Sequence, residues 1–323
     1  DSLTYTGQDQ ETHPFLLRSI EPNDDYTAWT LTARDGISFH DGTPFDAATL
    51  LDHFERMRAS PLIGPTLSDV DDVVEVDVMT VEVRMSRPWV TFPGYLSTQP
   101  GLVASPTWLA AVEAGQADPT EPVGTGPFVF AEYNSGRNFR VTRNDGYWLS
   151  DADGNPYPYL DEIEFVVQED DLTRDRSITS GEVDITHTDR GESLPGFREA
   201  VAAGDLEMYE ITERSEVTYG LVNGAAPDSP VSDVRIRRAI AHAIDQDLRN
   251  EARVGGMYPV ADGPFPPGVV GHLEDNGWPE YDPDRARELV EEYRADTGRD
   301  TVEIALNTTA DSENRATVEL LQQ

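Results

Sequence analysis

Two residue types are absent from this chain of 323 residues, which contains no cysteine and no lysine. The absence of cysteine excludes disulfide bonds, thiolate metal sites and cysteine nucleophiles together. The absence of lysine excludes the Gly-x-x-x-x-Gly-Lys loop that binds nucleotide phosphates in ATPases. The chain is therefore not the ATPase of any motor.

Positive charge is scarce: 24 arginines are outnumbered by 61 aspartates and glutamates, and the net charge is −37. A field this negative repels phosphate backbones, which excludes nucleic acid as a partner. Self-repulsion also destabilises the folded chain unless salt screens it. The composition therefore favours a protein adapted to molar salt, from a halophilic archaeon, over an acidic surface that attracts cationic ligands.

Long hydrophobic runs are missing as well. No stretch approaches the ~18 apolar residues that a membrane span needs, and no signal peptide opens the sequence. If the protein works outside the cell, we expect its export signal or membrane anchor to lie on a segment that has been removed. At about 150 residues per domain, the length predicts about two domains.

The sequence lacks the common catalytic motifs. None of the six histidines has the spacing of a His-Glu-x-x-His zinc site. The serine motif Gly-x-Ser-x-Gly has no match, since the nearest stretch, GESLPG from Gly191, is one residue too long. Paired carboxylates are uninformative in a chain this acidic. The sequence thus favours a protein without catalytic chemistry, and we expect no cofactor.

One spacing has the order of a calcium loop. Oxygen-bearing side chains occupy positions 1, 3, 5 and 12 of that template, namely Asp151, Asp153, Asn155 and Glu162. However, the glycine position of the template holds Pro156. A polar turn before a strand explains the same residues, so calcium binding and an ordinary turn both stay open.

A second polar turn, HDGTP, separates an alternating segment from an amphipathic one in residues 34–57. Asp41 and Gly42 predict a tight turn there. His40 has three interpretations: a general base, a ligand contact, or a turn residue whose ring nitrogen bonds the backbone. With no nucleophile or second histidine nearby in the sequence, we favour the turn residue, and the segment is interpreted as a joint.

Periodicity predicts a mixture of strands and helices. A strand is expected through Trp29, Leu31 and Ala33, and a helix begins after the N-cap residue Asp46. A hairpin with one buried side is expected, with Val74, Val76 and Val78 on its first strand, a turn near Met79 and Thr80, and then Val81, Val83 and Met85. Further expected elements are a hairpin turning at 134–136, strands at 160–167, 181–185, from 216 and at 301–307, and helices at 171–180, 232–248, 283–297 and at the end of the chain. This order favours α/β or α+β architecture with more than one lobe.

Five stretches, taken in order, resemble the extracellular solute-binding proteins of ABC importers, family 5, which carry peptides, nickel and some oligosaccharides. They cover roughly residues 14–322 and read WTLTARDGISFHDGTPFDAATLLDHFERM, EPVGTGPFVFAEYNSGRNFRVTRNDGYW, YLDEIEFVVQEDDLTRDRSITSGEVDI, SDVRIRRAIAHAIDQDLRNEARVGGMYPVADGPFPPG and YDPDRARELVEEY. Each is modest alone, and their order makes the set specific.

The resemblance implies an α/β fold of the periplasmic-binding-protein type II (cluster C), with mixed sheets, flanking helices and incomplete lobes. Residues 1–117 would be a second-domain-like subdomain, 118–228 the middle of the first domain, and 229–323 the truncated beginning of the third. Family members are longer, so we expect a fragment. The implied role is extracellular capture of a di- or oligopeptide, with an oligosaccharide as second choice, and delivery to an ABC permease. A monomer, membrane-anchored through a missing N-terminal segment, is expected.

The resemblance also carries over residues. Small residues that match the crossing between domains would act in the hinge or in interdomain packing, namely Gly124, Thr125, Gly126 and Pro127. Candidate ligand contacts are Thr98, Gln99, Tyr219 and Asn223. Thr98 and Gln99 stand where the nickel-binding branch has an arginine, which argues against a chelated metal as the ligand.

Two other classes of function remain as alternatives to the binding protein. A secreted hydrolase would turn over a peptide or a glycoside. An acidic adhesion or structural domain would show no change in melting temperature with any solute, whereas a binding protein is stabilised by its ligand.

Overall fold

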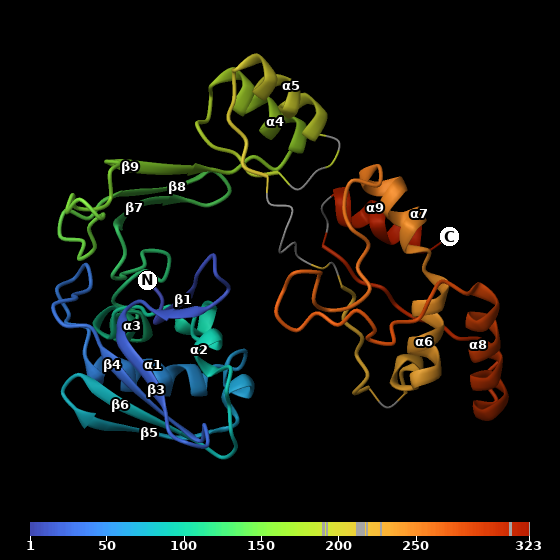
Figure 1. Ribbon diagram of the computed structural model, residues 1–323, viewed down its shortest axis with the longest axis horizontal. Helices are drawn as coiled ribbons and strands as arrows, with labels where there is room; N and C mark the ends of the chain where they lie inside the picture. The colour runs from blue at the N-terminus through green and yellow to red at the C-terminus, as the bar shows by residue number, and fades with distance from the viewer. Residues whose placement is uncertain are drawn as a thin grey trace. The chain divides into compact units, whose positions relative to one another are not determined.

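The structure is a computed structural model that describes residues 1–188, 191, 193–210, 217, 219–226, 228–309 and 312–322. The chain divides into two units, Asp1–Glu169 and Asp170–Gln323 (Figure 1). Each unit is described by itself. The three-part division at 117 and 228 stays a prediction.

The first unit contains three antiparallel sheets and short helices. One sheet pairs β1 (Thr4–Thr6) with β2 (Thr12–Pro14). The second has the order β3-β4-β6-β5, with the bounds Leu17–Pro22, Ala28–Ala33, Thr80–Met85 and Val70–Asp77. The helices are α1 (Ala47–Ala59), η1 (Gly64–Leu67), α2 (Phe92–Tyr95), η2 (Gln99–Gly101) and α3 (Pro106–Glu113).

The main core of this unit lies between the four-stranded sheet and α1. Trp29 and Leu31 of β4 are buried as their alternation predicted, and Leu50 and Phe54 of α1 are buried against the same cluster. Asp46 caps α1 as predicted, since its side chain accepts a hydrogen bond from the Thr49 amide at 3.0 Å. Local sequence chemistry therefore determined where this helix begins.

The β5–β6 hairpin corrects one prediction. The buried face comes from β6, through Val81, Val83 and Met85, whereas Val76 and Val78 are 58% and 70% exposed. The pairing register of β5 shifts twice, between Val70 and Asp72 and between Glu75 and Asp77. Each extra residue reverses which side chains face the core, so a strict alternation could not hold. The turn lies at residues 78–79, one position before the predicted one.

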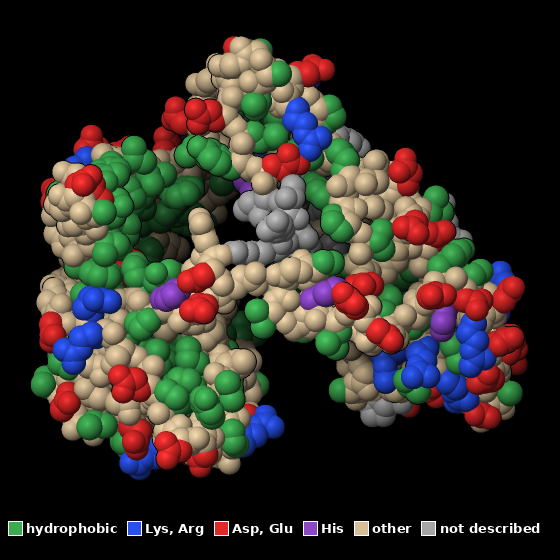
Figure 2. All heavy atoms as spheres, viewed as in Figure 1, with side chains coloured by type: hydrophobic (Ala, Val, Ile, Leu, Met, Phe, Trp, Pro, Cys, Tyr) green, Lys and Arg blue, Asp and Glu red, His purple; other side chains and the backbone are tan. Residues whose placement is uncertain are grey.

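A three-stranded sheet completes the first unit, with the order β7 (Phe128–Asn134), β8 (Asn138–Arg143), β9 (Glu162–Val166). The predicted hairpin and strand are confirmed. The register places apolar side chains on one face, including Phe130, Tyr133, Phe139, Val141, Ile163 and Phe165. Arg140 lies on the other face and pairs with Glu132 and Glu162. Hydrophobic side chains gather over the region of β7 and β8 in Figure 2.

The second unit is helical in its described residues. Its elements are α4 (Asp171–Ser180), α5 (Leu194–Ala203), η3 (Pro230–Ser232), α6 (Val234–Ala243), α7 (Gln246–Val254), α8 (Pro283–Thr297) and α9 (Ser312–Leu321). Ile236 of α6 and Tyr293 of α8 share one buried cluster, and Ala239 packs with Ala286 and Leu289 in another. The predicted ends of α4 and α8 are confirmed, since Gly181 and Gly298 both adopt the left-handed conformation.

The predicted helix at 232–248 is two helices. Ile244 leaves the helical conformation with φ −90° and ψ 113°, and Asp245 begins α7 by accepting a hydrogen bond from the Leu248 amide at 2.9 Å. Aspartate is favoured at the N-cap of a helix and disfavoured in a helix interior. Asp245 therefore begins a new helix, although the hydrophobic pattern continues across it.

Predicted strands in the second unit are absent from its described residues. The segment 181–185 instead wraps the end of α4, where the amides of Glu182 and Val183 both donate to the Ser177 carbonyl. Residues 301–307 alternate between apolar and polar side chains but pair with no described segment. They form no strand, because a β-strand requires backbone hydrogen bonds to a neighbouring strand. A strand was also predicted from residue 216. Positions 216, 218 and 227 lie outside the described residues, and residues 219–226 form no strand.

Candidate functional site

The candidate site begins with the HDGTP loop that follows β4. The loop folds on itself: the Phe39 amide donates to the Thr43 carbonyl at 2.8 Å, and the Gly42 amide donates to the Phe39 carbonyl at 2.8 Å. Gly42 has φ +83°, a conformation that glycine adopts without strain. The predicted tight turn at Asp41 and Gly42 is confirmed.

Asp41 ties this loop to α3. Its carboxylate accepts hydrogen bonds from the Ser105 hydroxyl at 2.5 Å and from the Thr43 amide at 2.9 Å. Partial burial raises the pKa of Asp41, but the hydrogen bonds from Ser105 and Thr43 outweigh it, so the pKa lies below its usual value. The aspartate therefore acts as an ionised anchor of the loop.

His40 joins the loop to residues 124–127, which we call the glycine crossing. The His40 amide donates to the Gly124 carbonyl at 2.9 Å. Its ring atom Nε2 lies 3.0 Å from the Gly126 carbonyl oxygen. A carbonyl oxygen only accepts, so Nε2 carries a proton and donates it to this bond. Nδ1 is buried without a hydrogen-bond partner in the part of the chain that is described.

The return from β8 meets the same crossing. The Asn144 side-chain amide also donates to the Gly126 carbonyl at 3.0 Å, and its main-chain amide donates to the Pro127 carbonyl at 2.9 Å. Thr125, between the two glycines, is 1% exposed. The glycine crossing is therefore held by the HDGTP loop on one side and by the β8 return on the other.

An aromatic side chain closes the arrangement. Trp148 packs against Phe15 with ring centroids 5.4 Å apart, and the Arg34 guanidinium lies 5.1 Å from its ring centroid. The Trp148 indole nitrogen and the Thr125 hydroxyl both donate to the Asp1 carboxylate at 3.3 Å. Burial raises the pKa of the neighbouring Tyr147.

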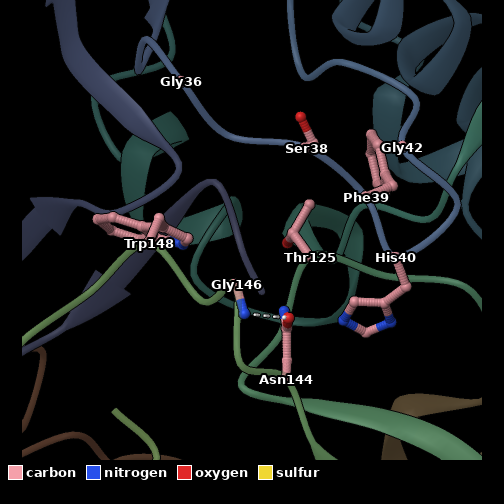
Figure 3. Close-up of a pocket in the computed structure, with 9 residues that line it drawn as sticks. All are labelled: Gly36, Ser38, Phe39, His40, Gly42, Thr125, Asn144, Gly146 and Trp148. Atoms are coloured by element: carbon pink, nitrogen blue, oxygen red, sulfur yellow. Dashed lines mark hydrogen bonds between the residues drawn. The ribbon is translucent and has the colours of Figure 1, made fainter. Parts of the chain in front are cut away.

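These segments surround a cavity of about 290 Å³ (Figure 3). Its lining combines hydroxyl, amide and imidazole groups with an aromatic face, from Gly36, Ser38, Phe39, His40, Gly42, Thr125, Asn144, Gly146 and Trp148. His40 uses Nε2 on the Gly126 carbonyl and makes no hydrogen bond to Ser38 among the described residues. A serine nucleophile needs a base within hydrogen-bond reach. The lining therefore offers hydrogen-bonding side chains and an indole ring, without a serine–histidine pair among the described residues.

The structure brings only some of the predicted site residues together. The turn residue His40 meets the glycine crossing, which consists of Gly124, Thr125, Gly126 and Pro127. The His40 ring bonds the backbone there, as expected for a joint. Thr98 and Gln99 are exposed at η2 and do not line the cavity, and the Thr98 hydroxyl donates to the Tyr95 carbonyl at 2.8 Å. Tyr219 and Asn223 belong to the second unit and are exposed. The roles of all of these residues in ligand binding and in hinge motion stay predictions.

The calcium candidate has hydrogen-bond partners of its own. The Asp151 carboxylate accepts from the Tyr159 hydroxyl at 2.5 Å and from the amides of Asp153 and Asn155, at 2.9 and 2.8 Å. The Tyr159 and Asn155 hydrogen bonds lower the pKa of Asp151 to about 2. Glu162 pairs with Arg140 at 3.0 Å. Calcium binding stays a prediction beside this closed polar turn.

Among the described residues, the one group of three clustered metal-ligating side chains is a different one, Asp9, Glu11 and His13. It lies at the β1–β2 turn, where Asp9 and Glu11 are exposed and His13 is half-buried. The Asp9 carboxylate and His13 Nε2 already form a hydrogen bond of 2.9 Å.

Sequence reasoning missed Asn144, Trp148 and Ser38. The signal for the first two was present, because the Asn-Asp-Gly turn and the Tyr-Trp pair directly follow a predicted strand. Their convergence on the HDGTP loop depends on contacts between segments more than a hundred residues apart.

Comparisons with known proteins agree with this arrangement. The sequence pattern of the family described as bacterial extracellular solute-binding proteins, family 5 Middle, matches residues 11–323. The glutathione-binding protein GsiB of Pectobacterium atrosepticum is 26% identical over 86% of this chain and 52% of its own length. The di/tripeptide-binding protein 2 of Pseudomonas aeruginosa is 27% identical over 86% of this chain and 54% of its own. The chain thus spans about half the length of the curated relatives that it matches.

A solved structure shows the fold. The dipeptide-binding protein of Pseudoalteromonas sp. SM9913, in complex with Met-Leu, aligns with a TM-score of 0.75 and 21% identity, over 100% of this chain and 66% of that one. The fold is that of the type II periplasmic binding proteins, an α/β arrangement of sheets and flanking helices, and the predicted fold class is confirmed. The prediction of mixed sheets is wrong for the described strands, whose pairings are all antiparallel. In the part of the chain that is described, no helix has the length and apolar composition needed to cross a membrane.

Proposed function

The chain belongs to the bacterial extracellular solute-binding proteins of family 5, and on that basis we propose that it captures a di- or oligopeptide and delivers it to an ABC importer. The observation that carries the proposal is the family match over residues 11–323, which includes every segment of the glycine crossing and its cavity. The family and the relatives are binding proteins, so the prediction that the chain is not an enzyme is confirmed.

The names of the relatives support a peptide as the solute. One binds glutathione, which is a modified tripeptide, and another binds di- and tripeptides. Both are about one-quarter identical to this chain, so they favour the class of ligand and not one peptide. An oligosaccharide is the second choice. A cavity that combines an indole face with hydroxyl and amide groups has the chemistry that either solute needs.

Capture requires two states of the protein. A solute shifts the population toward a closed form only if it makes more favourable contacts there than in the open form. We assign the lobes to residues 1–117, 118–228 and 229–323, with the glycine crossing as the joint between the first two. Thr98, Gln99, Tyr219 and Asn223 are the proposed ligand contacts, and residues 151–162 are a proposed calcium loop.

The family acts outside the cytoplasmic membrane, and the proposed place of this protein is the cell surface. We propose that it is a monomer, that its full-length form is anchored to the membrane through a segment preceding this sequence, and that its partner is the transmembrane part of an ABC permease. The predicted absence of nucleic acid as a partner rests on the net charge of −37.

A thermal-unfolding screen in molar salt tests the proposal. The probes are glutathione, the dipeptide Met-Leu, a set of longer peptides and a set of oligosaccharides, each with its free amino acids or monosaccharides as matched controls. A ligand at 100 times its Kd stabilises the native state by about 2.7 kcal/mol. We expect at least one peptide to stabilise the protein while its free amino acids do not.

The same screen separates the alternatives. Stabilisation by oligosaccharides alone would replace the peptide with the second choice. Product formation from an incubated peptide or glycoside would support a hydrolase. A chain whose unfolding temperature responds to no solute of either class would contradict the transport role.

A further inference from the structure

An attachment point for a glycan is offered by residues 299–309, the segment that follows α8. Residues 307–309 read Asn-Thr-Thr, which is the Asn-x-Ser/Thr motif that accepts N-linked glycans. The chain has ten asparagines, and Asn307 is the one followed two positions later by a serine or threonine. In an extracellular protein such a motif needs an exposed asparagine with an available amide nitrogen.

The amide nitrogens of the asparagines differ in this respect. In eight of the ten, Nδ2 donates a hydrogen bond within the protein: Asn23, Asn134, Asn138, Asn144, Asn155, Asn250, Asn276 and Asn314. Within the described residues, the side chains of Asn307 and Asn223 make no such bond. Asn223 is followed by Gly224 and Ala225 and lacks the motif. The motif therefore coincides with one of the two unengaged asparagine amides.

The local backbone leaves Asn307 accessible. Residues 299–309 form neither helix nor paired strand, and Asn307 is exposed. Apolar side chains alternate along the segment: Val302 packs against a core cluster, while Ile304 and Leu306 are about half exposed. Asn307 and Thr309 are polar, and both are exposed. A glycan on Asn307 would therefore replace none of the apolar contacts of this segment.

We propose that Asn307 is an N-glycosylation site. In the reaction, the Asn307 amide nitrogen forms a bond to the anomeric carbon of a saccharide carried on a lipid phosphate. The bond from that carbon to the lipid phosphate oxygen breaks, and the lipid phosphate leaves with the bond's electron pair. The amide gives up one proton to the base of the transferring enzyme. Nothing is oxidised or reduced, and the co-reactant is the lipid-linked saccharide.

The Thr309 hydroxyl has a defined position in this motif. Its Oγ1 accepts a hydrogen bond from the Asn314 side chain of α9 at 2.8 Å. This contact holds the end of the segment close to a helix, while Asn307, two residues earlier, stays outside it. The proposal rests on membership of an extracellular family and on this segment, and it does not depend on which solute the protein carries.

The test is mass spectrometry of the protein made and exported by its own cells. Cleavage after arginine gives a peptide of residues 300–315, DTVEIALNTTADSENR, and fragmentation within it separates Asn307 from Asn314. We expect a saccharide mass on Asn307 and none on Asn314, whose motif is absent, and none on Asn223. The substitutions Asn307→Gln and Thr309→Val should both remove it.

Thr308→Ala is the matched control, since it changes the neighbouring threonine but leaves the Asn-x-Thr motif complete. It should keep the saccharide at wild-type occupancy. Because residues 307–309 are exposed, all three variants should fold, which their unfolding temperatures can confirm. A peptide that carries only unmodified Asn307 in the wild-type protein, or a saccharide that persists in Thr309→Val, would overturn the proposal.

Discussion

His40 and Gly126 are 86 positions apart in the sequence, and His40 Nε2 lies 3.0 Å from the Gly126 carbonyl oxygen. The Asn144 amide donates to the same oxygen at 3.0 Å. One carbonyl therefore joins the HDGTP loop, the glycine crossing and the return from β8. The motif that the sequence analysis interpreted as a joint is a structural connection beside the cavity.

The first prediction concerns this shared acceptor. His40→Ala and Asn144→Ala each leave the Gly126 oxygen with one donor, whereas the double variant leaves it with neither. Each single change should lower the free energy of unfolding by about 1 kcal/mol, because a partly buried carbonyl keeps one hydrogen bond. The double variant should lose more than the sum, by about 1 kcal/mol, since residues that share a partner are not additive. Denaturant unfolding in molar salt measures all three.

His272→Ala is the control for that cycle. The His272 ring also bonds a carbonyl, that of Phe265 at 2.9 Å, but in an exposed part of the second unit. Its substitution should change stability by less than about 0.5 kcal/mol. Strict additivity of the His40 and Asn144 variants would show that the two donors do not support one another.

The second prediction concerns Gly101, beside the proposed ligand contacts Thr98 and Gln99. A Cβ added to Gly101 would lie 1.7 Å from the Leu96 carbonyl oxygen, which belongs to the backbone and cannot rotate away. The Gly101 carbonyl also accepts from the Leu3 amide at 2.8 Å, so the segment is fixed on both sides. Gly101→Ala should therefore destabilise the protein by more than about 4 kcal/mol.

Gly94→Ala provides the comparison. Its added Cβ would meet the Thr12 hydroxyl at 3.6 Å, an ordinary van der Waals distance. The same chemical change should therefore cost less than about 1 kcal/mol there. Circular-dichroism melting of the two variants distinguishes them, and equal melting temperatures would refute the close packing at Gly101.

Local chemistry made several elements of the fold predictable. Asp46 and Asp282 cap their helices, and Gly181 and Gly298 end theirs, because these residue types satisfy helix ends by short-range hydrogen bonds and backbone freedom. The hairpin at 134–136 was predictable for the same reason. Each of these features depends on fewer than six consecutive residues.

The failures depend on partners that are distant or on small shifts of register. Val76 is exposed because it lies at a register shift in β5, and Val78 is exposed because it lies in the turn that follows; nothing in the strand itself marks either change. The segment 301–307 has a strand pattern without a paired neighbour in the described residues. At the site, glycines 124 and 126 were identifiable by resemblance, but the donors that hold them come from loops that sequence spacing does not connect.

The third prediction is a pH dependence that comes from His53. This side chain is buried in α1, its Nε2 lies 2.9 Å from the Pro100 carbonyl, and burial lowers its pKa below the usual 6.5. The unfolded chain therefore takes up a proton at a higher pH than the folded chain. Stability is complete above about pH 6.5 and falls as the pH drops below it, by at most about 1.4 kcal/mol per pH unit, until the folded pKa is reached.

Unfolding free energies at pH 7.5, 6.5 and 5.5 measure how steeply stability falls with pH. These pH values lie above the range in which carboxylates titrate. His53→Gln can still donate to the Pro100 carbonyl but cannot be protonated, so its stability should vary less over the same window. A slope that is equal in the variant and the wild type would assign the pH dependence to other groups.

The last prediction follows from the charge of −37 and concerns salt. Asp71 and Glu75 are exposed on β5, in a strand that also carries Asp72 and Asp77. Neutralising them as Asp71→Asn and Glu75→Gln removes like-charge repulsion and should raise stability by about 0.5 kcal/mol at low salt. In molar salt the screening length falls to about 3 Å, so the same pair of substitutions should have almost no effect.

Arg84→Gln removes an exposed cation that pairs with Glu82, and it should lower stability at low salt. Melting temperatures across a salt series compare the three proteins: convergence at high salt is expected, and a difference that persists unchanged in molar salt would mean that these side chains act through packing or hydrogen bonds and not through the field of the whole chain.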